Sequence, residues 1–255
     1  MNKSRRNFIR KTGIAGVAAF TAPGLLSAVN TSRSVLQKEG KSGLTILFQG
    51  DSITDGNRTR NDDWNHVMGH GYQFIISSKY WFDYPEKKFM FYNRGISGNR
   101  VRDLETRWQK DTLDLKPDVI SILVGINDVA ATIWDREPES IEKFEEHYRN
   151  ILNQTKKALP NTKIILCEPF CLPVGRVADK LETYQHEIQK RQTVIRKLAK
   201  EFDTVYVELQ KPFTEACEKA PANYWIWDGI HPMPAGHELI AREWNKKVAG
   251  LLIDK

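Results

Sequence analysis

The chain has 255 residues, of which 40% are hydrophobic and 27% are charged. These values fit one globular domain with a substantial core and exclude a disordered chain or a small disulfide-stabilised scaffold. The formal net charge of +6 invites a nucleic-acid-binding function, but five of these charges come from Lys3, Arg5, Arg6, Arg10 and Lys11, in a segment without acids. The rest of the chain carries only +1, with acids and bases interspersed, so we expect no nucleic-acid partner.

Residues 1–28 combine the pair Arg5-Arg6 with a short apolar stretch and small residues near Ala28. This pattern is typical of an export signal of the twin-arginine type, and the stretch is too short and too weakly apolar for a convincing membrane span. We expect residues 29–43 to form a linker and residues 44–255 to form the folded domain, exported to the periplasm or the outside. A basic helix of the domain and an uncleaved anchor remain open alternatives.

Short apolar runs alternate with amphipathic segments along the rest of the chain. The runs predict five strands, at residues 44–48, 89–93, 119–124, 163–167 and 204–207. Helical spacing predicts helices at residues 71–81, 101–110, 138–159, 181–202, 213–220 and 234–252, with an insert at 129–137. This alternation predicts a parallel sheet covered on both faces, a three-layer α/β/α sandwich.

Ser52 directly follows the first predicted strand. In open parallel sheets, ligands bind at the carboxyl ends of the strands, so Ser52 is a candidate nucleophile. A serine hydroxyl needs a general base, a group that orients the base, and donors for the developing oxyanion. Asp228 and His231 are three residues apart, a spacing that lets the carboxylate hold one imidazole nitrogen while the other faces Ser52. Asn127 follows the third strand, where its amide can donate to an oxyanion.

Four segments resemble the conserved blocks of the SGNH (GDSL-type) hydrolase family, in that family's order and at its usual separations. They are Gly50-Asp51-Ser52, Asn93-Arg94-Gly95-Ile96-Ser97-Gly98-Asn99, Gly125-Ile126-Asn127-Asp128 and Asp228-Gly229-Ile230-His231. The resemblance covers roughly residues 44–252, and Ile53 stands where the family name has leucine. It implies a flavodoxin-like fold with a five-stranded parallel sheet and an esterase- or lipase-like acylhydrolase activity.

Carried over position by position, the resemblance implies a role for each of five residues. Ser52 becomes the nucleophile, His231 the base and Asp228 its partner. The oxyanion donors become the backbone N–H groups of Ser52 and Gly98 and the amide of Asn127. The chemistry requires no cofactor and no metal.

Large aromatic residues lie beside the predicted catalytic segments and bear on the substrate. Trp64 lies in the polar loop after Ser52, while Trp225 and Trp227 precede Asp228. Such rings serve equally as a hydrophobic stack or as a platform for sugars. Together with export, they favour a carbohydrate O-acetylesterase. A lysophospholipase, a thioesterase and an inactive carbohydrate-binding protein on a hydrolase scaffold remain alternatives, and the oligomeric state stays open.

Several other polar residues receive weaker expectations. His66 and His70 are four residues apart but lack further ligands at suitable spacing, so we expect no metal site. Glu168, after the fourth strand, is either a substrate contact or a solvated loop residue. The chain has three cysteines without a framework pattern, which leaves a disulfide between two of them open: Cys167, Cys171 and Cys217.

Overall fold

A computed structural model describes residues 43–61 and 63–253. The predicted export signal and the linker up to residue 42 lie outside the described residues. They therefore stay predictions.

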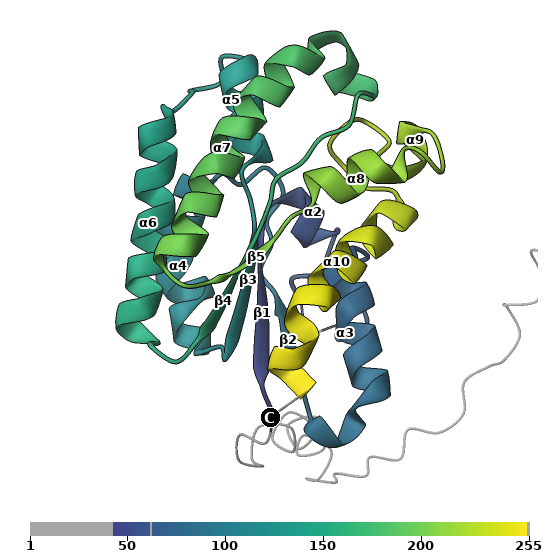
Figure 1. Cartoon of the computed structure of the whole chain (residues 1–255). Coiled ribbons are helices and arrows are strands. Elements are labelled where there is room, and N and C mark those ends of the chain that lie inside the picture. Colours follow the sequence, from purple (N-terminus) through teal and green to yellow (C-terminus); the bar gives the residue numbers. More distant parts are fainter. Residues whose placement is uncertain (1–42, 62, 254–255) are drawn as a thin grey trace, which may run out of the picture. The chain divides into compact units, whose positions relative to one another are not determined.

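Five parallel strands form one sheet in the order β2-β1-β3-β4-β5 (Figure 1). The strands are β1 (Thr45–Gly50), β2 (Met90–Asn93), β3 (Val119–Leu123), β4 (Lys163–Cys167) and β5 (Val205–Val207). Every predicted strand is present, with ends that differ by at most two residues. In the register, Phe48 of β1 lies between Asn93 of β2 and Ser121 of β3. This is the flavodoxin-like order, and the prediction of the fold class is confirmed.

The central strands are buried along their whole length. All six residues of β1 and all five of β3 are buried, including polar Thr45, Gln49 and Ser121. Their apolar, β-branched runs fit this position because helices cover both faces of a parallel sheet.

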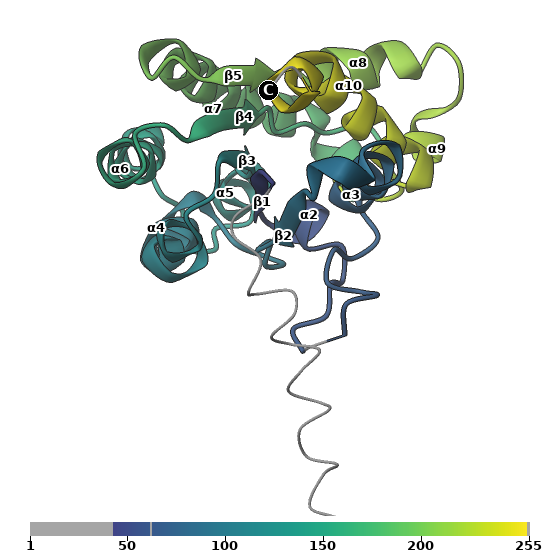
Figure 2. The same ribbon diagram turned by 90° about the horizontal axis from the view of Figure 1, so that it is seen from below.

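The longer helices form one layer on each face of the sheet (Figure 2). One layer contains α3 (Tyr72–Asp83) and α10 (Pro234–Ile253), and the other contains α4 (Val101–Asp111), α6 (Ile141–Ala158) and α7 (Leu181–Glu201). Each layer has its own apolar core. Phe48, Tyr72 and Trp244 pack in the first core, and Trp108 and Tyr148 pack in the second.

Short helical segments complete the fold. They are α2 (Ser52–Asp55), α5 (Ile126–Ile133), α8 (Gln210–Ala216), α9 (Ala222–Trp225), η1 (Pro85–Lys87), η2 (Leu113–Leu115) and η3 (Gly175–Lys180). No helix of the described ranges is long and apolar enough to cross a bilayer. All three cysteines are free thiols in the structure.

Several helix boundaries differ from the sequence-based prediction. The helix expected at 213–220 is α8, which begins at Gln210 and ends at Ala216. The expected insert at 129–137 is mostly helix α5, which begins directly after β3 because Ile126, Val129 and Ile133 recur at helical spacing and pack into the core. The helix expected from residue 138 begins at Ile141 instead. Ser140 caps it by accepting a hydrogen bond from the Lys143 N–H at 3.3 Å.

Candidate active site

The order of the strands brings three loops together at the carboxyl edge of the sheet. Strand β1 ends just before Ser52, and its neighbours β2 and β3 lead into the loops that carry Gly98 and Asn127. The sheet order switches direction around β1, which is where ligands bind in such folds. A fourth loop, before α10, carries Asp228 and His231.

A short helical turn presents Ser52. Asp51 caps helix α2 by accepting a hydrogen bond from the Ile53 N–H at 3.0 Å, and Ser52 is the first helical residue. Burial raises the pKa of Asp51 to about 7, although the Ile53 N–H and the nearby His231 oppose this rise. Through its hydrogen bond with the Ile53 N–H, Asp51 holds the turn that presents Ser52.

The three predicted triad residues form a continuous chain of hydrogen bonds. The Ser52 Oγ lies 2.8 Å from His231 Nε2, and His231 Nδ1 lies 2.8 Å from Asp228 Oδ2. An ionised carboxylate only accepts hydrogen bonds, so Nδ1 carries the proton and the Nε2 lone pair faces the hydroxyl. This geometry allows His231 to take the proton of Ser52.

The acid is held in place by its own turn. Asp228 Oδ1 accepts hydrogen bonds from the N–H groups of Ile230 at 3.0 Å and His231 at 2.7 Å. Burial raises the pKa of Asp228, but the His231 ring and these two N–H groups outweigh it and hold the pKa well below its usual range. Asp228 is thus ionised and available to stabilise an imidazolium.

A segment that sequence reasoning missed packs against this turn. The Arg176 N–H donates to the Asp228 carbonyl at 3.1 Å, and its guanidinium Nη2 lies 2.6 Å from Asp228 Oδ2. Gly175 adopts φ +54°, and a Cβ there would lie 2.5 Å from the Asp228 Cα. No spacing rule pointed to Arg176, because its contact with Asp228 arises from loop packing.

Gly98 presents a backbone N–H that no described residue accepts. Four other N–H groups of its loop are bonded: Gly95 to Asn93 Oδ1, Ile96 to the Gly50 carbonyl, Ser97 to Asp55 Oδ2 and Asn99 to the Ile96 carbonyl. Within the described part of the chain, the Gly98 N–H has no acceptor. Gly98 has φ +84°, and a Cβ there would meet no atom within 4 Å, so it faces open space.

Asn127 lies in the first turn of α5, beside the same loop. Its Nδ2 donates to the Asn99 carbonyl at 3.1 Å, which uses one of the two amide N–H groups. Ser52 opens α2, where backbone N–H groups have no partner within the helix. The predicted oxyanion donors thus lie on three segments, which follow β1, β2 and β3 at this edge of the sheet.

Arg107 supports the Gly98 loop from α4. Its guanidinium donates to Asn99 Oδ1 at 2.8 Å, to the Arg94 carbonyl at 2.8 Å and to Gln49 Oε1 at 3.0 Å, and it pairs with Asp111. Helical spacing does not indicate which loop a long side chain reaches.

The three tryptophans are not gathered into one platform. Trp64 lines a cavity beside β2, whereas Trp225 lines another between α8 and α10 and donates its indole N–H to the Ala220 carbonyl. Trp227 is exposed next to Asp228. A role for each in substrate binding therefore stays a prediction.

Neither expectation for Glu168 is correct. Its carboxylate is buried and accepts hydrogen bonds from the N–H groups of Leu209 and Gln210, both at 2.9 Å, at the start of α8. It also accepts one from the Tyr206 hydroxyl at 2.7 Å. Glu168 fixes α8 to the sheet.

Among residues 43–61 and 63–253, no three His, Cys, Asp or Glu side chains lie together in a way that could hold a metal ion. His66 instead pairs with Asp63 through Nδ1 at 2.7 Å.

Comparisons with known proteins agree with this fold. An acetylxylan esterase from Geobacillus stearothermophilus is 32% identical over 213 residues, covering 81% of this chain and 94% of that protein. Its crystal structure superposes with a TM-score of 0.71. Three further structures of that esterase are catalytic mutants in which an aspartate, a histidine or a serine is replaced by alanine. An uncharacterized lipoprotein from Bacillus subtilis is 24% identical over 52% of this chain and 51% of its own.

A second solved structure is more similar in sequence. A putative GDSL-like lipase from Parabacteroides merdae is 39% identical, covers 81% of this chain and 95% of that chain, and has a TM-score of 0.77. The sequence model of the GDSL-like lipase/acylhydrolase family matches residues 48–239. The chain therefore belongs to this family and is a carboxylic ester hydrolase.

Proposed function

We propose that the protein removes short acyl groups, chiefly O-acetyl groups, from carbohydrates through Ser52, His231 and Asp228. The observation that carries this proposal is the hydrogen-bond chain from Ser52 through His231 to Asp228. The Gly98 N–H, which has no acceptor among the described residues, supports it. The substrate class is supported by the similarity to an acetylxylan esterase.

The reaction is acyl transfer to water in two halves. His231 Nε2 takes the Ser52 proton as Oγ bonds to the ester carbonyl carbon, and Asp228 stabilises the imidazolium. The negative charge on the carbonyl oxygen is held by the N–H groups of Ser52 and Gly98 and the Asn127 amide. The C–O bond to the sugar then breaks, with the His231 proton going to the sugar oxygen. His231 then takes a proton from a water molecule as the water oxygen bonds to the acyl carbon. The bond from the acyl carbon to Ser52 Oγ breaks, His231 gives its proton to Oγ, and the carboxylic acid leaves.

Acetate release tests the proposal. The protein comprising residues 29–255 is assayed for acetate release from acetylated xylan and other acetylated polysaccharides. Its hydrolysis of p-nitrophenyl esters of increasing acyl-chain length is measured alongside. We expect acetate release and a preference for the short esters. Ser52→Ala should lose about 10³-fold or more in kcat. The activity that remains would come from substrate binding and the oxyanion donors alone.

Other outcomes would redirect the assignment. Preference for acyl chains beyond eight carbons would indicate a lysophospholipase or thioesterase. Sugar binding without labelling of Ser52 by a serine-directed phosphonate would indicate a carbohydrate-binding protein that has lost its activity.

We also propose that residues 1–28 direct export. The similarity to a lipoprotein is compatible with export. Replacing Arg5 and Arg6 with lysine should retain the protein in the cytoplasm, as measured by cell fractionation.

A further inference from the structure

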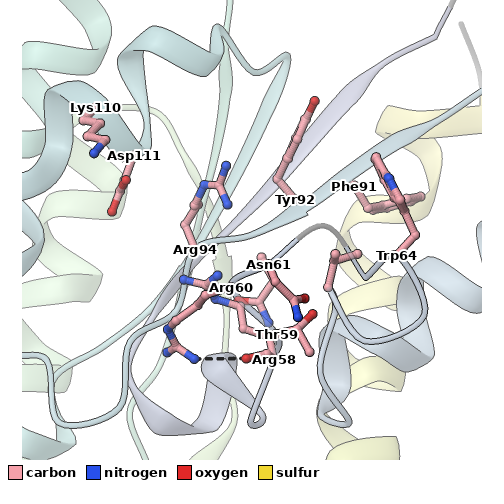
Figure 3. Close-up of a pocket in the computed structure, with 12 residues that line it drawn as sticks. Arg58, Thr59, Arg60, Asn61, Trp64, Phe91, Tyr92, Arg94, Lys110 and Asp111 are labelled. Atoms are coloured by element: carbon pink, nitrogen blue, oxygen red, sulfur yellow. Dashed lines mark hydrogen bonds between the residues drawn. The ribbon is translucent and has the colours of Figure 1, made fainter. Parts of the chain in front are cut away.

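A cavity of about 510 Å³ lies along the free edge of strand β2 (Figure 3). This volume falls within the range of small-molecule sites. Its lining includes four cationic residues and one carboxylate: Arg58, Arg60, Arg94, Lys110 and Asp111. The carboxylate of Asp111 already pairs with Arg107 at 3.0 Å, which lies outside the cavity lining. The cavity therefore carries excess positive charge.

Arg94 is a cation of this lining that is available to a ligand. Its carbonyl accepts a hydrogen bond from Arg107, but its guanidinium has no hydrogen bond or ion pair among the described residues and lies over the Tyr92 ring, 5.7 Å from the centroid. Figure 3 shows Arg94 beside Arg58 and Arg60. A half-buried guanidinium without an anion is a ready partner for a carboxylate, which it can bind with two parallel hydrogen bonds.

Arg58 is buried in the same cluster. Its Nε donates to the Gly95 carbonyl at 3.0 Å. Burial, followed by repulsion from Arg60, lowers the pKa of Arg58 to about 10, so it stays charged at neutral pH. A bound anion would relieve this repulsion.

The cavity also offers a surface for a sugar ring. Trp64 lines it and is 60% exposed, although it is a large aromatic residue. Aromatic faces provide amphipathic contact area of the kind that sugar rings use. The loop of residues 93–99 carries Arg94, which lines the cavity, at one end and Gly98 near the other, so one loop links the cavity to the proposed oxyanion site. Asp55 couples them, since its Oδ2 pairs with Arg60 at 2.6 Å and accepts the Ser97 N–H at 3.0 Å.

We propose that this cavity is a subsite for a uronate residue of the glycan whose ester is cleaved at Ser52. The guanidinium of Arg94 binds the sugar carboxylate, and Trp64 packs against the ring. The inference rests on the proposed carbohydrate esterase function, and it makes acidic acetylated glycans the preferred substrates.

Binding to the Ser52→Ala protein tests the subsite without turnover. The probes are oligosaccharides that carry one glucuronic acid, and the same oligosaccharides with the carboxylate reduced to an alcohol, titrated by calorimetry. We expect the acidic form to bind about ten-fold more tightly or better, and Arg94→Gln to abolish this preference. Arg94→Lys should retain part of it. Lys200→Gln, which removes an exposed charge on α7, is the matched control and should keep it all.

Three results would overturn the inference. The acidic and reduced probes could bind equally to the Ser52→Ala protein. Arg94→Gln could keep the preference. Inorganic sulfate at equal concentration could displace the acidic probe completely, which would indicate a general anion site. A failure of the proposed function is distinguishable, because it would show as no acetate release from neutral acetylated oligosaccharides by the Ser52-containing protein.

Discussion

The guanidinium of Arg176 lies 2.6 Å from Asp228 Oδ2, the same oxygen that accepts the hydrogen bond from His231 Nδ1. One carboxylate oxygen is thus shared between a permanent cation and the proposed general base. The cation disfavours a second positive charge on His231, which must be neutral to accept the Ser52 proton.

Replacing Arg176 should therefore change the pH dependence of catalysis. In Arg176→Gln the positive charge beside Asp228 Oδ2 is lost, so the acid limb of the kcat/KM profile should move to higher pH. The shift is small because the arginine side chain is half exposed and screened. Arg176→Lys should stay near the original profile. If Arg176→Gln lowered the Tm but left the acid limb of the kcat/KM profile in place, Arg176 would serve only to hold its loop against Asp228.

Two glycines with positive φ provide a matched test of the loop that packs on Asp228. Alanine at Gly98 meets no atom within 4 Å, so only the left-handed backbone costs about 1–2 kcal/mol. That corresponds to a fall in Tm of about 2–8 °C. Alanine at Gly175 adds a clash with the Asp228 backbone at 2.5 Å. Thermal melts should show the larger fall for Gly175→Ala, and equal falls would remove the steric argument.

Asn127→Ala tests the side-chain oxyanion donor. Loss of one such donor costs about 10²–10³ in kcat, with little change in KM, because the donor acts mainly on the transition state. Steady-state kinetics on a short p-nitrophenyl ester measure this effect. Asn127→Asp keeps the size of the side chain but replaces the donor with a carboxylate, so it should be at least as impaired. Unaltered kcat in both variants would exclude Asn127 from the oxyanion site.

Asp128 should make the stability of the protein fall as pH rises. Burial raises the pKa of Asp128 from 3.8 to about 7, although Arg191 opposes the shift. Between about pH 4 and pH 7 the unfolded chain is ionised here while the folded protein keeps the proton, so ionisation progressively penalises the folded state. Urea unfolding at several pH values measures this dependence.

Asp128→Asn should remove that slope. The difference between the free energy of unfolding of Asp128→Asn and that of the unmodified protein should rise from about pH 4 to pH 7. Asp135→Asn, at an exposed residue, is the control for loss of a carboxylate. A difference between Asp128→Asn and the unmodified protein that stays constant with pH would contradict the prediction.

The positions of the strands and of the proposed triad residues could be predicted from the sequence for a physical reason. Buried parallel strands are short apolar runs, and residues that follow them must meet at one edge of the sheet. Ser52 and Asn127 were placed in this way, and the spacing of Asp228 and His231 reflects a single turn. Helix α5 was missed because Asn127 and Asp128 resembled a loop, although its apolar spacing was present.

Contacts that long side chains make with distant segments could not be predicted from the sequence. Arg176 reaches Asp228, and Arg107 reaches Asn99, because packing sets the separation of their backbones. Glu168 shows the same limit. A carboxylate before a proline resembled a solvated residue until α8 supplied its N–H donors.

The Ser52 hydroxyl and the His231 imidazole that contact each other are separated by 179 positions in the chain. During synthesis, the nucleophile leaves the ribosome long before its base exists. A chain interrupted before residue 231 would carry an inert serine, so the newly made protein gains reactivity only after its base has been synthesised.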